Sequence, residues 1–192
     1  MLDLIKSIDL EILLAINHSG NEFIDKVMVL ISNRFTWIPF YLLLAILLFK
    51  TCRQHFVYVL IAAAVLILLS DQTSVLLKNA VGRYRPCHHV PIASMLKLPD
   101  GCGGLYGFPS SHAANTAALA FFLIPLFKNN RKLMSALMIS YCLLVGYSRI
   151  YLGRHYVTDI ISGWVVGAAC GLLVFFAFQK IIHHVSQNSK LE

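Results

Sequence analysis

Three short polar blocks interrupt an otherwise apolar sequence, and their side chains suit the binding of a phosphate group. The blocks lie at residues 78–86, 109–112 and 148–159. The candidate phosphate-binding residues within them are Lys78, Arg85, Ser110, Ser111 and Arg149. Arginine offers a planar fork that binds two phosphate oxygens at once, and lysine acts as a point charge. Because a single nearby acid accompanies these cations, the blocks predict an anion site, and phosphate fits it best.

The third block also predicts a nucleophile together with the acid that orients it. His155 and Asp159 are four residues apart, so on a helix they share one face. A carboxylate at Nδ1 fixes the tautomer of the ring and leaves Nε2 free to attack. His112 is the candidate general acid, and Ser110 and Ser111 are expected to cap the helix that begins there. The residues alone also allow Asp159 to act only as a helix cap.

The elements that hold these blocks are predicted to be membrane helices. Of the 192 residues, 58% are hydrophobic and 13% are charged, whereas a soluble domain carries about 25% charged residues. This composition excludes a disordered chain, a coiled coil and an acidic solvating protein. The net charge of +7 would suit nucleic acid on a soluble surface. We expect no such partner and assign the excess to basic loops and to the anion site.

Five stretches carry little or no charge and are the candidate membrane spans: Phe35–Phe49, Phe56–Ser70, Ala113–Phe127, Leu133–Ser148 and Ile160–Gln179. A span needs about 20 residues, and several of these stretches have only about 15. They reach span length only by including polar neighbours such as Lys78, Pro109 and Arg149. The three blocks are therefore expected at one membrane interface, on the same side of the bilayer.

The N-terminal residues predict a helix that lies on the membrane surface. Its apolar face recurs at spacings of three and four: Ile5, Ile8, Ile12 and Ile16. If the next stretch, Phe23–Arg34, crosses the bilayer, the chain has six spans instead of five. We therefore predict an all-α fold, an integral membrane helical bundle of five to six transmembrane helices with an N-terminal amphipathic helix. Its parts are the N-terminal helices, 1–34, the transmembrane domain, 35–182, and a C-terminal tail, 183–192.

The three blocks together resemble the signature of the PAP2 superfamily, the type 2 phosphatidic acid phosphatases. That signature reads K-x6-R-P, P-S-G-H and S-R-x5-H-x3-D, and every spacing matches between Lys78 and Asp159. One position departs, because Ser111 stands where the family usually has glycine. The resemblance covers about residues 55 to 180. Each block alone is a weak signal, and the combination is specific.

The resemblance implies a mechanism for the matching positions. His155 would attack phosphorus and form a phosphohistidine, Asp159 would orient it, and His112 would protonate the leaving group and later activate water. Lys78, Arg85, Arg149, Ser110 and the backbone of Ser111 would hold the phosphate oxygens. The resemblance implies neither metal nor cofactor, because fixed cations take the place of a metal.

The resemblance also implies a substrate class and a location. Small bacterial members of the family act on undecaprenyl diphosphate, phosphatidylglycerol phosphate or the phosphates of lipid A, and the sequence does not choose among them. We expect a lipid phosphate within the bilayer as substrate and an active site at the periplasmic face of the bacterial inner membrane. The alternative is a non-hydrolytic lipid-phosphate carrier or flippase. The oligomeric state is not predicted.

The loop between the first two blocks contains a candidate disulfide. Cys87 and Cys102 bracket one segment, and a disulfide is permitted if that segment is extracytoplasmic. Three further polar residues have open roles. Asp71 is either a partner of Lys78 or a structural group in the bundle, and Arg83 and Arg154 are candidate contacts for lipid headgroups or anchors at the interface.

Overall fold

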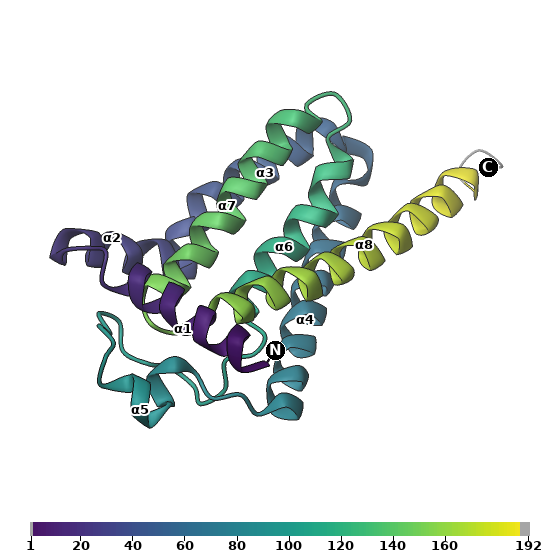
Figure 1. Ribbon diagram of the computed structural model, residues 1–192. Coiled ribbons are helices and arrows are strands. Elements are labelled where there is room, and N and C mark those ends of the chain that lie inside the picture. The colour runs from purple at the N-terminus through teal and green to yellow at the C-terminus, as the bar shows by residue number, and fades with distance from the viewer. Residues whose placement is uncertain (1, 189–192) are drawn as a thin grey trace.

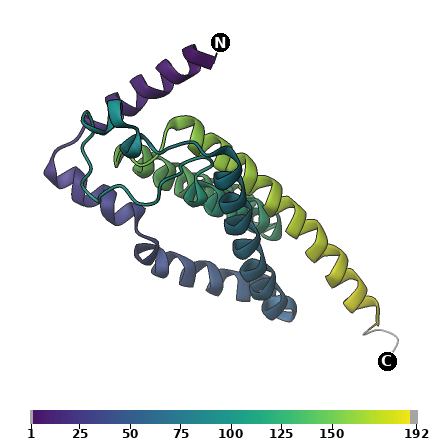
Figure 2. The same ribbon diagram turned by 90° about the horizontal axis from the view of Figure 1, so that it is seen from below.

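The chain is described by a computed structural model that covers residues 2–188 and is built from helices (Figures 1 and 2). The α-helices are α1 (Leu2–Asn17), α2 (Glu22–Ser32), α3 (Ile38–Thr51), α4 (Phe56–Val81), α5 (Val90–Ala93), α6 (Ser111–Leu123), α7 (Arg131–Tyr151) and α8 (Val157–Asn188). Short 3-10 turns lie at η1 (Arg34–Trp37), η2 (Arg53–His55), η3 (Pro86–His88) and η4 (Ile124–Leu126). The predicted all-α fold is confirmed.

Within residues 2–188, four helical segments are long and apolar enough to cross a membrane: Arg34–Thr51, Arg53–Val81, Arg131–Tyr151 and Val157–Gln187. A shorter apolar helix, Ser111–Leu126, lies among them and corresponds to the third predicted span. α2 has 11 residues, which make about 16 Å of helix, whereas the hydrocarbon core is about 30 Å thick. α2 therefore does not cross, and the bundle fits the lower of the two predicted numbers of spans.

The outer surfaces of the long helices carry large apolar side chains that face away from the protein. Leu68 of α4 and Val165 of α8 are 64% and 65% exposed. Such exposure would be unfavourable in water and is expected where lipid covers the surface. α8 continues to Asn188, so the first part of the predicted C-terminal tail is helical. Residues 189–192 lie outside the described part of the chain.

α6 and α8 lie side by side with their backbones in close contact (Figure 1). Glycines at every fourth position of α8 make this approach possible, because a methyl group at Gly163, Gly167 or Gly171 would collide with backbone atoms of Ser110, Ala114 or Ala118. Small residues with this spacing are typical of tightly packed membrane helices. The packing fixes the start of α6 against the start of α8, where two of the three polar blocks lie.

α1 covers the same end of the bundle (Figure 1). Three residues of the predicted apolar face, Ile5, Ile8 and Ile12, are exposed, as the surface-helix prediction requires, and Ile16 is half-buried. The helix packs against the protein through a different stripe that contains Asp9, Leu13 and Asn17. Asn17 donates to the carbonyl oxygens of Lys97, at 2.8 Å, and Tyr151, at 2.7 Å. That the free face of α1 contacts lipid stays a prediction.

Candidate active site

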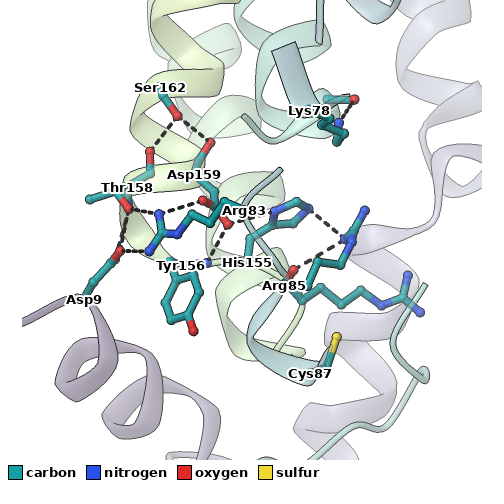
Figure 3. A network of polar contacts seen from close by, with 12 residues as sticks. Asp9, Lys78, Arg83, Arg85, Cys87, His155, Tyr156, Thr158, Asp159 and Ser162 are labelled. Atoms are coloured by element: carbon teal, nitrogen blue, oxygen red, sulfur yellow. Dashed lines mark hydrogen bonds and ion pairs between the residues drawn. The ribbon is translucent and has the colours of Figure 1, made fainter. Parts of the chain in front are cut away.

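The three polar blocks meet at one end of the bundle, between the start of α8, the start of α6 and the loop after α4 (Figure 3). The backbone N–H of Ser110 donates to the carbonyl oxygen of Asp159 at 2.9 Å, which joins the second block to the third. Four of the predicted site residues are almost inaccessible, with exposed fractions of 3% or less: Ser110, Arg149, His155 and Asp159. Polar groups buried this deeply need partners or a ligand.

The turn between α7 and α8 positions His155. Gly153 has a φ of +67°, the left-handed conformation that glycine adopts readily at the end of a helix. The N–H groups of Gly153 and Arg154 bond back to the carbonyl oxygens of Ile150 and Arg149, at 2.9 and 3.1 Å. This tight turn keeps Arg149, in the last turn of α7, close to the imidazole of His155.

The contacts of His155 define its tautomer (Figure 3). Nε2 lies 3.0 Å from a terminal nitrogen of Arg85, and Nδ1 lies 3.4 Å from Oδ2 of Asp159. A guanidinium only donates, so Nε2 accepts and the ring proton is on Nδ1, toward the carboxylate. Burial, and after it the charges of Arg85, Arg149 and Lys78, hold the pKa of the His155 imidazole well below its ordinary value. The ring is therefore neutral, with a lone pair on Nε2.

Asp159 has two tasks. Its Oδ2 also accepts from the backbone N–H of Tyr156 at 3.1 Å, the bond by which an acidic residue in the first turn caps a helix. Asp159 thus caps α8, but it is not only a helix cap, because the same oxygen faces His155. The 3.4 Å separation from Nδ1 is longer than a strong hydrogen bond, so Asp159 orients the ring mainly through its charge. A methyl group at Gly107 would lie 2.8 Å from this oxygen, which shows how closely the loop before α6 covers it.

Several buried donors near His155 lack partners within the described residues. They are Nε of Arg85, Nε of Arg149 and Oγ of Ser110. Other groups of the cradle are occupied: Lys78 donates to Oγ of Ser111, and Arg149 donates to Oγ of Ser32 at the end of α2. An unpaired buried donor is costly unless a ligand satisfies it. The unpaired groups belong to the residues from which the sequence predicted a phosphate cradle.

The prediction that Ser110 and Ser111 cap α6 with their side chains is wrong. Ser110 occupies the N-cap position, but its hydroxyl makes no capping bond to the described backbone. Ser111 is the first residue of the helix, and its hydroxyl accepts from Lys78 instead. The N–H groups of the first turn of α6 remain directed out of the helix end. The cap prediction assumed an ordinary helix start, whereas here the Ser111 hydroxyl binds the Lys78 ammonium and the Ser110 hydroxyl is buried without a partner among the described residues.

His112 lies on the first turn of α6 and lines a small cavity of about 180 Å³. Ser32 and Asn115 line the same cavity, and the charge of Arg149 acts on the His112 ring. The structure thus brings His112 to the side of the cradle that α2 and α6 form, where its imidazole faces the cavity.

The sequence model described as the PAP2 superfamily matches residues 54–183. The chain belongs to the PAP2 superfamily. It is 32% identical to a lipid A 4'-phosphatase of Bacteroides thetaiotaomicron, over 98% of this chain and 85% of that protein. It is 30% identical to an undecaprenyl-diphosphatase of Sulfolobus acidocaldarius, over 83% and 73%. The fold is similar to the crystal structure of a transmembrane PAP2 phosphatidylglycerolphosphate phosphatase from Bacillus subtilis, with a TM-score of 0.63, 23% identity and coverage of 95% and 88%.

Two charged residues of this PAP2 chain, Arg83 and Asp9, belong to the surroundings of the site, and the sequence interpretation placed neither of them there. Arg83, whose role the sequence left open, donates to Oδ1 of Asp159 at 2.9 Å and to Oδ2 of Asp9 at 2.8 Å. Residues 83–85 pair with residues 105–107 in a short antiparallel bridge. Alternate side chains of extended backbone share a face, so the two-residue spacing of Arg83 and Arg85 was the available signal. Nothing in the sequence indicated Asp9.

The structure also shows the surroundings of Arg154 and Asp71, whose roles the sequence of this PAP2 chain left open. Arg154 forms an ion pair with Asp100 at 2.6 Å and donates to the carbonyl oxygen of Gly101, so it ties down the long loop. Asp71 lines the cavity that contains His112, and its charge acts on Lys78.

Cys87 and Cys102 form a disulfide that closes the loop after α4. His88 lies beside them, and the three side chains have the spacing of a metal site. Because the two sulfurs are bonded to each other, neither is available as a thiolate ligand. Two glycines that follow Cys102 differ in their surroundings: Gly107 is crowded, whereas a methyl group at Gly104 would meet nothing within 4 Å.

Proposed function

We propose that this chain hydrolyses a lipid phosphate through a phosphohistidine on His155. The observation that carries the proposal is the state of the His155 ring. Nε2 has a lone pair, Nδ1 faces a carboxylate, and buried cations with unpaired N–H groups surround the nucleophilic nitrogen. A site that only binds phosphate needs the cations but has no use for an oriented, neutral imidazole.

The reaction proceeds in two transfers. Nε2 of His155 attacks phosphorus while the bond from phosphorus to the leaving oxygen breaks, and His112 gives that oxygen a proton. Arg85 moves its N–H from Nε2 to a phosphate oxygen as the new bond forms. Lys78 and Arg149 stabilise the charge on the equatorial oxygens. Water then attacks the phosphohistidine, His112 takes the proton from the water, and free phosphate leaves His155 neutral again.

A large apolar cavity supports a lipid substrate. It has a volume of about 760 Å³, within the usual range of ligand sites, and leucine and alanine side chains of α3, α4 and α6 line it. The smaller cavity that contains His112 shares several residues with it, including Arg34, Asp71 and Asn115. The acyl chains of a lipid can therefore stay between membrane helices while the phosphate lies beside His155.

Charge supports an active site at the outer face of the membrane. Six basic residues around the site make bonds within the protein: Lys78, Arg83, Arg85, Lys97, Arg149 and Arg154. The opposite end carries exposed basic residues: Lys50, Arg53, Lys128, Arg131, Lys132 and Lys180. Exposed basic residues favour the cytoplasmic side, which supports a site at the periplasmic face of a bacterial inner membrane.

The first substrate to test is a lipid A phosphate, because lipid A 4'-phosphatases are among the relatives that match most of the chain. We expect the purified protein to release phosphate from it in the presence of EDTA. His155→Ala should abolish release, whereas His89→Ala, which changes an exposed histidine of the loop, should retain it. Vanadate should inhibit as a mimic of the transition state. Loss of activity in EDTA, or activity that survives His155→Ala, would refute the mechanism.

The same assay distinguishes hydrolysis from the carrier or flippase alternative. A carrier would bind the lipid phosphate and return it intact, so lipid recovered after incubation would keep its phosphate. Undecaprenyl diphosphate, assayed in parallel, tests whether the protein prefers an anhydride to a phosphate monoester.

A further inference from the structure

A chain of buried charges connects the N-terminal helix α1 to the site (Figure 3). Asp9 on α1 pairs with Arg83 at 2.8 Å, and Arg83 pairs with Asp159 at 2.9 Å. The guanidinium thus bridges two carboxylates that lie on the first and last helices of the fold. Asp159 in turn faces the nucleophilic ring of His155.

Burial makes this bridge more than a surface contact. The side chains of Asp9 and Asp159 are 1% and 0% exposed, and that of Arg83 is 28% exposed. Two buried carboxylates repel each other unless a cation lies between them. Removing one partner of a buried charge pair leaves an uncompensated charge, which is much worse than losing an exposed ion pair.

Both ends of the bridge are held in place. Asp9 also accepts from the backbone N–H of Thr158 at 3.1 Å and from the hydroxyl of the same residue. Arg83 stacks over the ring of Tyr156, 4.2 Å from its centre. Arg83 therefore cannot follow Asp159 to another position, and Asp159 cannot rotate without losing its partner.

The division of oxygens shows what the bridge does. Arg83 binds Oδ1 of Asp159, which leaves Oδ2 for the Tyr156 N–H and for Nδ1 of His155. Without Arg83, the carboxylate is free to turn toward the cations of the phosphate cradle. The His155 ring would then lose the charge that sets its orientation.

We propose that Arg83 and Asp9 are positioning residues for the reaction, so that α1 contributes a residue to the active site. The proposal rests on the function proposed above and adds to it two residues outside the PAP2 signature. Arg83 fixes Asp159 directly, and Asp9 acts only through Arg83. Neither residue touches the phosphate, so both act on the chemical step and not on phosphate binding.

The test compares Arg83→Met and Asp9→Asn with Asp3→Asn, which changes an exposed carboxylate on the same helix. Loss of an outer partner of a site commonly lowers activity about 10- to 100-fold, so we expect kcat to fall in this range for Arg83→Met and at least several-fold for Asp9→Asn. KM and the inhibition constant of inorganic phosphate should stay within about twofold. Asp3→Asn should match the unmodified protein.

Two further variants separate positioning from simple stability. The double variant Asp9→Asn with Arg83→Met should be no slower than Arg83→Met alone, because Asp9 acts through Arg83. Arg83→Lys should regain part of kcat, since it restores a cation beside Asp159. Losses that multiply in the double variant, or a KM that rises as kcat falls, would overturn the proposal. If Arg83→Met does not fold, the nearly isosteric Asp9→Asn decides alone.

Vanadate binding, measured by calorimetry, gives a readout without turnover. Vanadate bonds to the oriented Nε2, so Asp9→Asn should weaken its binding about tenfold while phosphate binding stays unchanged. If the unmodified protein released no phosphate but this difference in vanadate binding were present, the proposed function would fail and the positioning role would stand. Equal vanadate binding by Asp9→Asn and Asp3→Asn would overturn the positioning role.

Discussion

Gly107→Ala tests how closely the loop before α6 fits the His155–Asp159 pair. The added methyl group would lie 2.8 Å from Oδ2 of Asp159 and 3.3 Å from Cγ of Arg85. Ordinary contact begins at 3.4 Å, so a movement of the carboxylate oxygen by 3.4 − 2.8 = 0.6 Å would restore it. Asp159 is completely buried and has no open side toward which it can move without losing a partner.

The size of the effect follows from this displacement. If Oδ2 moves away from Gly107 and from the ring, its 3.4 Å separation from Nδ1 of His155 approaches about 4 Å, beyond hydrogen-bond distance. A misplacement of about 1 Å in a site can lower the rate about 100-fold. A shift of this size should therefore reduce kcat/KM about tenfold, equivalent to about 1.4 kcal/mol in the barrier.

The assay is phosphate release from a lipid phosphate in detergent micelles, with thermal stability measured on the same preparations. Gly104→Ala is the matched control, because its methyl group would meet nothing within 4 Å. We expect Gly104→Ala to retain full activity and both variants to stay folded. If folded Gly107→Ala were as active as Gly104→Ala, the geometry derived for Asp159 would be wrong.

Three further predictions concern the pH profile, the loop and the lipid cavity. The pKa of His155 lies well below its ordinary value of about 6.5, so protonation of this ring should not lower kcat/KM as the pH falls through 6.5. A loss of kcat/KM centred at that pH would contradict a neutral, buried ring. Cys87→Ser should lower the free energy of unfolding by about 3 kcal/mol, because the disulfide closes a loop with a sequence separation of 15, and mass mapping without reductant that found both thiols free would exclude the bond. Asn115→Leu should raise KM for a lipid A phosphate but leave hydrolysis of a small soluble phosphate ester unchanged. The reason is that Oδ1 of Asn115 is buried without a described partner where the two cavities meet. An equal effect on both substrates would place Asn115 in the reaction instead.

Features that depend on local spacing could be predicted from the sequence. The four-residue spacing of His155 and Asp159 indicated that their side chains face each other, although His155 lies in the turn before α8 and the two residues do not share a helical face. The apolar stretches define the helices by length and composition alone. The short stretches correctly indicated that polar residues belong to the ends of the spans. α4, for example, continues through Asp71 and Lys78 to Val81.

Contacts between distant segments could not be predicted in this way. Asp9 and Arg83 are 74 residues apart, and their contact exists only because α1 packs with its Asp9 stripe inward. The periodicity of α1 identified an apolar face but not the face that the protein would cover. The cap predicted for Ser111 failed for a related reason, since the Lys78 ammonium that binds its hydroxyl comes from another helix, α4.

The bridge through Arg83 also sets the order in which the protein can be completed during its synthesis. Asp9 is synthesised 149 residues before its partner Thr158, which lies at the start of α8. The ribosome must therefore deliver α8 to the membrane before α1 can take its final place. A nascent chain that stops before α8 holds Asp9, Arg83 and His155 but lacks Asp159. Insertion of α8 thus closes the bridge to α1 and brings Asp159 to the His155 ring at the same time.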